Sequence, residues 1–242
     1  MRDTPLKTVC LVSFACASAF GCLESEGTLG EAQNGSFQYE CLDWGDPVCD
    51  GEQPTGLFDP LFDERSEQAL PQRIALGSAF DVRFYEFGDL PGSPGLERPV
   101  EAAAETLLDA LSPGFVARAP GTVALLARDG KGDVADLIHM VIEPAYRVEV
   151  EGPTTALALS ESADLFTRVF SESNGQLGGA LPHTWSVDNP GIVILEHPYS
   201  TSEDALSDDH IVARAVGPGT ALVSVSVGDL QTTIEIRVDG GN

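Results

Sequence analysis

Histidine is the side chain most often used for proton transfer and metal binding, and the chain contains four of them. They are His139, His183, His197 and His210. None stands in a His-x-x-x-His or Glu-x-x-His spacing, so no zinc motif of that kind is present. No Gly-x-Ser-x-Gly turn presents a nucleophilic serine. We therefore predict a protein that is not an enzyme, with no catalytic residue, no cofactor and no metal-binding residue.

Two acidic stretches could supply oxygen ligands. In "RDGKGDVAD" (residues 128–136), an EF-hand loop would need an oxygen where Lys131 stands, so the stretch is interpreted as a solvated hairpin tip. "YSTSEDALSDDH" (residues 199–210) is a long acidic loop, and long loops on a rigid scaffold often bind ligands. A calcium or carbohydrate site on Ser200–His210 therefore stays open as the alternative to a mobile acidic loop.

Cys41 and Cys49 flank the turn-forming sequence "LDWGDPV". In an oxidising compartment, two cysteines that close so short a loop most simply form a disulfide. A metal site is the weaker alternative, because no histidine lies between Thr8 and Ile138. We predict a Cys41–Cys49 disulfide.

The amino terminus predicts export. Arg2 and Lys7 give it a positive start, and the uncharged run "VCLVSFACASAF" (residues 9–20) follows. That run is shorter than the ~20 apolar residues of a membrane-spanning helix. A positive start, a short apolar core and small residues before a break are typical of a signal peptide, here residues 1–21.

Cys22, in "AFGC", resembles the lipid-modified cysteine of bacterial lipoproteins. The match keeps Gly21 and Cys22 and departs at Ala19 and Phe20, where leucine and a small residue are usual. The resemblance implies a membrane anchor, since acyl chains contribute ~0.8 kcal/mol per buried CH₂. The alternative is an ordinary signal peptide with incidental cysteines, which would release a periplasmic or secreted protein.

The charge of the chain excludes several partners. The chain has 13 basic and 38 acidic residues and a net charge of −25. Cleavage after residue 21 removes two of the basic residues and one acidic residue, which leaves a net charge of −26. Nucleic acids and anionic membrane surfaces are therefore unfavourable partners, because binding to them needs clustered cations. Membrane attachment is expected through the lipid alone.

Residues 22–66 lack sustained periodicity and are rich in Glu, Asp, Gly and Pro. We interpret them as a flexible acidic stem, with the Cys41–Cys49 loop as its one ordered point.

An internal repeat follows the stem. "FVARAPGTVALLARDGKGDVADLIHMVIE" begins at Phe115, and "IVARAVGPGTALVSVSVGDLQTTIEIRVD" begins at Ile211. Each copy alternates apolar and polar residues on both sides of a Gly/Asp turn, and that pattern predicts a β-hairpin. The repeat predicts two domains, residues 67–146 and 147–242, each with several short strands.

Upstream, the segments 73–87 and 154–172 each predict a strand, a turn and a second strand. Residues 100–111, "VEAAAETLLDAL", have apolar side chains at helical spacing. The repeat aligns them with "WSVDNPGIVIL" (residues 185–195) and so predicts strand and turn. We follow the repeat, because tertiary context often overrides propensity.

The second copy resembles the bacterial Ig-like domain of the group-two type, found in invasin and intimin-like stalks. "WSVDNP" from Trp185, "VARA" from Val212 and "PGTA" from Pro218 carry the resemblance. It implies two tandem antiparallel Ig-like β-sandwiches, an all-β fold, with Trp185 in the second core and Gly219 turning the chain between sheets.

The same resemblance implies a structural, adhesive or partner-binding role without catalysis. Together with Cys22 it predicts a cell-envelope lipoprotein at the outer membrane or cell surface of a Gram-negative-type bacterium, in contact with an envelope protein or a glycan. Besides the calcium- or carbohydrate-binding module, a second rival is a chain that accompanies a catalytic partner on another chain.

Overall fold

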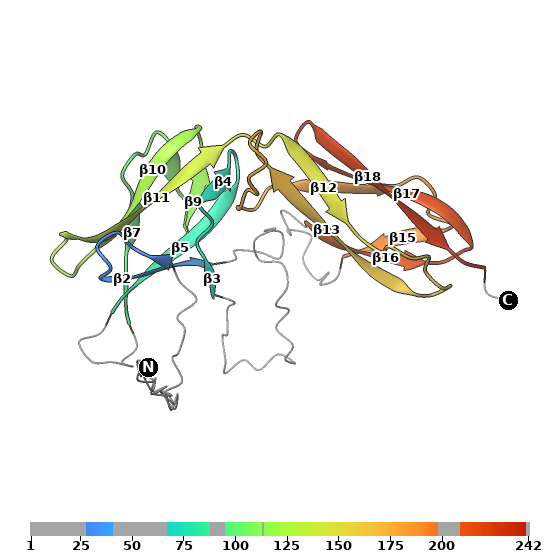
Figure 1. Ribbon diagram of the computed structural model, residues 1–242, viewed down its shortest axis with the longest axis horizontal. Coiled ribbons are helices and arrows are strands. Elements are labelled where there is room, and N and C mark those ends of the chain that lie inside the picture. Colours follow the sequence, from blue (N-terminus) through green and yellow to red (C-terminus); the bar gives the residue numbers. More distant parts are fainter. Residues whose placement is uncertain (1–27, 41–66, 88–94, 113, 198–208, 241–242) are drawn as a thin grey trace, which may run out of the picture.

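The computed structural model describes residues 28–40, 67–87, 95–112, 114–197 and 209–240, and every regular element among them is a β-strand. They form two sandwiches that lie end to end along the long axis of the molecule (Figure 1). No helix in the described part of the chain is long and apolar enough to cross a membrane.

The first sandwich contains eleven strands. Their bounds are β1 (Thr28–Leu29), β2 (Gly35–Glu40), β3 (Glu67–Ala69), β4 (Arg73–Ala75), β5 (Ala79–Glu86), β6 (Leu96–Arg98), β7 (Val100–Ala102), β8 (Leu108–Ala110), β9 (Phe115–Ala117), β10 (Gly121–Arg128) and β11 (Val134–Glu143). One sheet has the order β1-β2-β5-β9-β8, with β3 also on β2 and β6 also on β5. The other has the order β4-β11-β10-β7, in which β4 runs parallel to β11.

The second sandwich contains seven strands. Their bounds are β12 (Arg147–Glu151), β13 (Ser162–Phe170), β14 (His183–Val187), β15 (Val193–Glu196), β16 (His210–Ala215), β17 (Gly219–Val227) and β18 (Leu230–Val238). One sheet has the order β12-β13-β16-β15 and the other β14-β17-β18. The two-sheet architecture, antiparallel except where β4 pairs with β11, confirms the predicted all-β sandwich fold.

Each sandwich encloses its own core, because alternate residues of every long strand face inward. In the first core, Phe37, Tyr39, Phe80 and Phe84 are at most 1% exposed. The ring centroids of Phe37 and Phe84 lie 4.8 Å apart, so an aromatic pair lies within the first core. In the second core, Leu165, Val193, Ala213 and Ile236 are at most 1% exposed.

Both repeat hairpins form as predicted. β10 pairs with β11 around a turn at Asp129–Asp133, and β17 pairs with β18 around Gly228 and Asp229. Gly228 has φ +57°, as expected for the first central residue of a type II′ turn.

Residues 100–111 form two strands and no helix. β7 pairs with β10 in one sheet, and β8 pairs with β9 in the other. The aligned segment does the same, because β14 pairs with β17 and β15 with β16. Leu108 and Val193 are both buried at the start of the second strand, so the chain changes sheets at equivalent places in the two copies.

The structure differs from the sequence prediction in two places. Residues 28–40, expected within the flexible stem, instead form β1 and β2, and β2 pairs with β5 over six residues. Phe37 and Tyr39 alternate along β2 and are fully buried, so core packing holds this segment in the sheet. In segment 154–172 the first expected strand is reduced to a single bridge between Leu157 and Val238, and only β13 forms.

Candidate functional site at the joint between the two sandwiches

The two sandwiches are joined by a short covalent link. β11 ends at Glu143 and β12 begins at Arg147, so three residues connect the domains. Tyr146 N–H donates to the carbonyl of Phe170, which ties the link to the second sandwich. A link this short restricts the distance between the domains but does not by itself fix their orientation.

A second connection does fix the orientation. The segment between β13 and β14, residues 171–182 (the joint loop), reaches back to the first sandwich and pairs with its backbone. Ala75 N–H donates to Gly178 O at 2.9 Å, and Gly178 N–H donates to Arg73 O at 2.9 Å. Ala79 and Ala180 exchange two hydrogen bonds of 3.0 and 2.8 Å. The joint loop therefore extends the sheet edge at β4 and caps the start of β5.

Close approach at the joint depends on Gly179. Its φ is +97°, a region that L-residues with side chains rarely adopt. A Cβ atom at Gly179 would lie 2.0 Å from Oγ and 2.6 Å from Cβ of Ser78. Ser78 cannot easily move, because it is fully buried and its hydroxyl donates to Ala75 O at 2.7 Å. Only glycine fits here without displacing the first sandwich.

A small apolar cluster fills the joint. It draws Ala75 from the first sandwich and its other buried members from the second, namely Val148, Val169, Leu177, Leu181 and Val227. Leu177, on the joint loop, is 0% exposed. Separating the domains would remove Ala75 from this cluster and expose the surface that it covers, at about 25 cal/mol per Å² of apolar surface.

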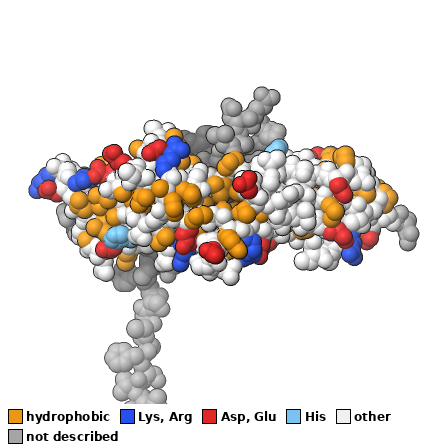
Figure 2. All heavy atoms as spheres, turned by 90° about the horizontal axis from the view of Figure 1, so that it is seen from above, with side chains coloured by type: hydrophobic (Ala, Val, Ile, Leu, Met, Phe, Trp, Pro, Cys, Tyr) orange, Lys and Arg blue, Asp and Glu red, His pale blue; other side chains and the backbone are white. Residues whose placement is uncertain are grey.

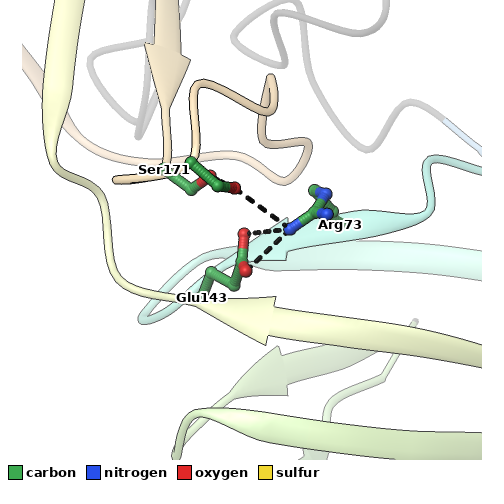
Figure 3. Close-up of polar contacts among 4 residues, drawn as sticks. Arg73, Glu143 and Ser171 are labelled. Carbon is green, nitrogen blue, oxygen red and sulfur yellow. Dashed lines mark hydrogen bonds and ion pairs between the residues drawn. The ribbon is translucent and has the colours of Figure 1, made fainter.

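An ion pair borders the apolar cluster. One guanidinium nitrogen of Arg73 lies 2.7 Å from both carboxylate oxygens of Glu143, and the same nitrogen lies 3.5 Å from Ser173 Oγ. Figure 3 shows Arg73 and Glu143 facing the turn that carries Ser171. The hydrogen bond from Arg73 lowers the pKa of Glu143 below its ordinary value of 4.5, partial burial opposes this, and Ser171 adds a smaller lowering.

On the second sandwich, the guanidinium of Arg147 stacks over Phe170, 4.3 Å from the ring centroid. Both residues adjoin the interdomain link and the joint loop. Backbone pairing and apolar burial thus connect the two sandwiches, while each sandwich places one charged contact of its own beside the joint.

The cysteines of the predicted sites, Cys22, Cys41 and Cys49, lie outside the described residues. Most of the Ser200–His210 loop also lies outside them, and only Asp209 and His210 can be placed. Asp209 is 0% exposed and its carbonyl accepts from Thr167 N–H at 2.8 Å. His210 stacks on Phe166 and contacts Asp164 Oδ1 at 2.8 Å. These two side chains thus pack into the second sandwich.

The acidic hairpin tip of the first sandwich is organised by its own backbone. Asp129 Oδ1 accepts from the N–H groups of Lys131 and Asp133, at 2.8 and 2.9 Å. Asp136 is buried and accepts from the N–H groups of Ala32, Asn34 and Leu137 at 2.8 to 2.9 Å. Within the described part of the chain, no three His, Cys, Asp or Glu side chains gather as metal ligands would.

Trp185 and Gly219, the two residues given a role by the resemblance, lie on strands of the second sandwich. Trp185 lies on β14, partly buried against the second core rather than filling its centre. Gly219 begins β17, where the chain leaves the sheet of β16 for the opposite sheet, and it has φ +136°. The joint itself was missed by sequence reasoning, although Gly178 and Gly179 in "QLGGALPH" are a signal of close backbone approach.

A scan of protein-family profiles finds no match to the chain, and a search of curated proteins finds none. Solved structures similar to it include domains 4 and 5 of the S-layer protein SbsC, 11% identical, covering 65% of this chain and 90% of that one with a TM-score of 0.32. The Escherichia coli adhesin FdeC is 13% identical over 71% of this chain and 62% of that one, with a TM-score of 0.34. A β-glycosidase from Bacteroides vulgatus is 12% identical over 67% of this chain and 23% of that one, with a TM-score of 0.32.

Proposed function

We propose that the chain is a non-catalytic spacer of the cell envelope, in which two Ig-like sandwiches act as one stiff unit that holds a contact surface away from its point of attachment. The observation that carries this proposal is the joint loop, which connects the sandwiches a second time through four backbone hydrogen bonds. Two points of attachment suppress both bending and twisting, whereas the three-residue link alone would permit both.

In this proposal the amino terminus attaches the chain to the membrane. Acyl chains on Cys22 would hold the chain at the outer membrane or cell surface, and a Cys41–Cys49 disulfide would close a short loop, residues 41–49, within the connection between β2 and β3. The high negative charge keeps an exported protein soluble and disfavours nucleic acids and anionic membrane surfaces as partners. An envelope protein or a glycan is the partner that this setting favours.

Stiffness can be tested with the chain from residue 22 onward carrying Cys22→Ser. A spin label on each sandwich reports the interdomain distance by pulsed electron resonance, and small-angle X-ray scattering reports the shape. We expect a narrow distance distribution for the parent chain. We expect Gly179→Ala to broaden it, because the added Cβ would overlap Ser78.

Gly132→Ala is the matched control. Gly132, on the tip of the β10–β11 hairpin, has φ +89°, close to the +97° of Gly179, but a Cβ atom there would meet nothing within 4 Å. Both variants therefore carry similar backbone strain, and only Gly179→Ala disturbs the joint. A broad distribution in the parent chain, or equal distributions in all three proteins, would reject the stiff spacer.

The anchor has a separate test. The full chain is expressed in a Gram-negative host, and the intact mass of the membrane-fraction protein is measured beside Cys22→Ala. We expect a mass that matches a chain beginning at an acylated Cys22, absent from the variant. If both proteins are free in the periplasm and carry no lipid, the anchor is wrong, and the chain is a periplasmic or secreted module.

A further inference from the structure

The outer face of the sheet formed by β4, β11, β10 and β7 is unusually apolar. Along β10 and β11 the alternate residues Val123, Leu125, Ala127, Met140 and Ile142 face the core. The residues between them therefore point outward. The apolar ones among these outward residues, all partly exposed, are Ala124, Leu126, Leu137 and Val141, which we call the apolar face. Figure 2 shows hydrophobic side chains gathered over the first sandwich, while the surface of the second consists mostly of backbone and uncharged polar or glycine residues, drawn in white.

The second sandwich shows that the fold does not require this apolar face. In the repeat, β17 and β18 occupy the places of β10 and β11. Leu126 pairs across the strands with Leu137, whereas the equivalent pair in the second sandwich is Ser224 with Thr233. Val141, opposite Thr122, is replaced by Arg237, opposite Thr220. At these three positions the second copy thus carries polar or charged side chains, whereas at the position of Ala124 it carries Leu222, which is 44% exposed.

The charges around the apolar face are paired. Glu101 contacts Arg128, and Arg73 lies 2.7 Å from Glu143. Glu31 Oε1 contacts His139 Nδ1 at 2.5 Å, a pair that is ionic when the histidine is protonated. With His139 uncharged, these groups carry a net charge of −1 (three carboxylates and two arginines), which is small beside the −25 of the whole chain. Two molecules can meet here with little of the like-charge repulsion that opposes contact elsewhere.

The size of the face sets the expected strength. The strands β4, β11, β10 and β7 have 3, 10, 8 and 3 residues, so at ~3.3 Å per residue and ~4.8 Å per strand the whole outer side of the sheet measures about 400 Å². The apolar face is part of this area. Stable complexes bury ~800 Å² per partner, so a contact of this size is weak and reversible.

We propose that the apolar face is a self-association surface, on which a second copy of this chain packs its own apolar face about a two-fold axis. An isologous contact packs the apolar residues of one copy against those of the other. The arginines bordering the face of each copy can then pair with carboxylates of the other copy. The proposal does not depend on the stiff joint, because the four residues of the apolar face lie on β10 and β11 of the first sandwich.

Sedimentation equilibrium of the Cys22→Ser chain from residue 22, at micromolar to millimolar concentration, tests the proposal. We expect a monomer–dimer equilibrium that strengthens when salt is raised from 0.05 to 0.5 M. Salt screens the overall repulsion of the two acidic chains, with a Debye length of ~10 Å at 0.1 M. Leu126→Ser with Leu137→Thr, which introduces the residues of the second copy, should weaken the dimer by about tenfold or more.

Leu222→Ser is the matched control, because Leu222 is 44% exposed on the outer face of the second sandwich. Circular dichroism and melting temperature must show that each variant remains folded. A parent chain that stays monomeric to millimolar concentration overturns the proposal. So does a dimer that Leu222→Ser weakens as much as the double variant does.

Discussion

The bond between Arg73 and Glu143 is the residue-scale contact that most directly links pH to the joint. The carboxylate gains its partner only in the folded chain, and its pKa is lowered from the ordinary value of 4.5. A group with a depressed folded-state pKa contributes stability above its unfolded pKa, and that contribution is lost as the pH falls through the folded value.

We therefore expect Glu143→Gln to lower the free energy of unfolding at pH 7 and to have little effect at a pH below the folded-state pKa of Glu143. The side chains of Arg73 and Glu143 are 38% and 25% exposed, so solvent screening limits the effect to about 0.5 kcal/mol. Urea unfolding across this pH range measures it. A double-mutant cycle with Arg73→Met isolates the pair, and a zero coupling energy at pH 7 would contradict the assignment.

At the scale of elements, Asp136 of β11 holds the turn between β1 and β2. Its carboxylate accepts three backbone N–H groups while buried, two of them from Ala32 and Asn34. Asp136→Asn replaces one acceptor oxygen by a donor facing other donors. We expect a loss of about 1–3 kcal/mol in stability.

Hydrogen exchange measured by NMR would locate the effect of Asp136→Asn. The amides of Ala32 and Asn34 should exchange faster, while those of β17 and β18 remain protected. Asp133→Asn, on the exposed tip of the same hairpin, should leave the exchange rates of all these amides nearly unchanged. Unaltered protection at Ala32 and Asn34 in the Asp136 variant would show that the β1–β2 turn does not rely on this carboxylate.

The hairpins and the sheet-switching segments of both copies were predictable, because their signals are local. The alternation of apolar and polar residues predicts β17 and β18. For residues 100–111 the spacing alone would predict a helix, and the alignment with the second copy predicts the strands β7 and β8 instead. β2 was not predicted, because Phe37 and Tyr39 are its only large apolar residues and stand in an acidic, Gly-rich context. Their burial depends on pairing with β5, more than 40 residues later, which no local pattern reveals.

The joint was unpredictable for the same reason. Gly178 and Gly179 indicate close approach, but the sequence does not say what approaches them. The partners, Arg73 to Ser78, precede the joint loop by about 100 residues and are reached only when both sandwiches have formed. The resemblance to Ig-like domains implied each sandwich separately and left their mutual orientation open.

At the scale of the whole molecule, the shared apolar cluster should couple the unfolding of the two sandwiches. We expect a single calorimetric transition for the parent chain. Leu177→Ala truncates a fully buried side chain of the joint loop and should cost about 2–5 kcal/mol.

With that contact weakened, the second sandwich should melt at a lower temperature than the first, giving two resolved transitions. Leu159→Ala provides the control, because Leu159 is 51% exposed and lies outside the joint. Two independent transitions in the parent chain would show that the cluster does not couple the domains.

The joint loop also has a consequence for the order in which the chain can be completed. β4 is a sheet edge until Gly178 pairs with it, and Ser173 follows Arg73 by 100 residues. Ribosomes add ~5–20 residues per second, so β4 stays unpaired on this side for about 5–20 s before the joint loop is synthesised. An open edge is a template for pairing with other chains, and the three-residue length of β4 keeps that hazard small. The sheet edge of the first sandwich is therefore completed by the joint loop of the second. A chain truncated between the two sandwiches would keep the β4 edge unpaired.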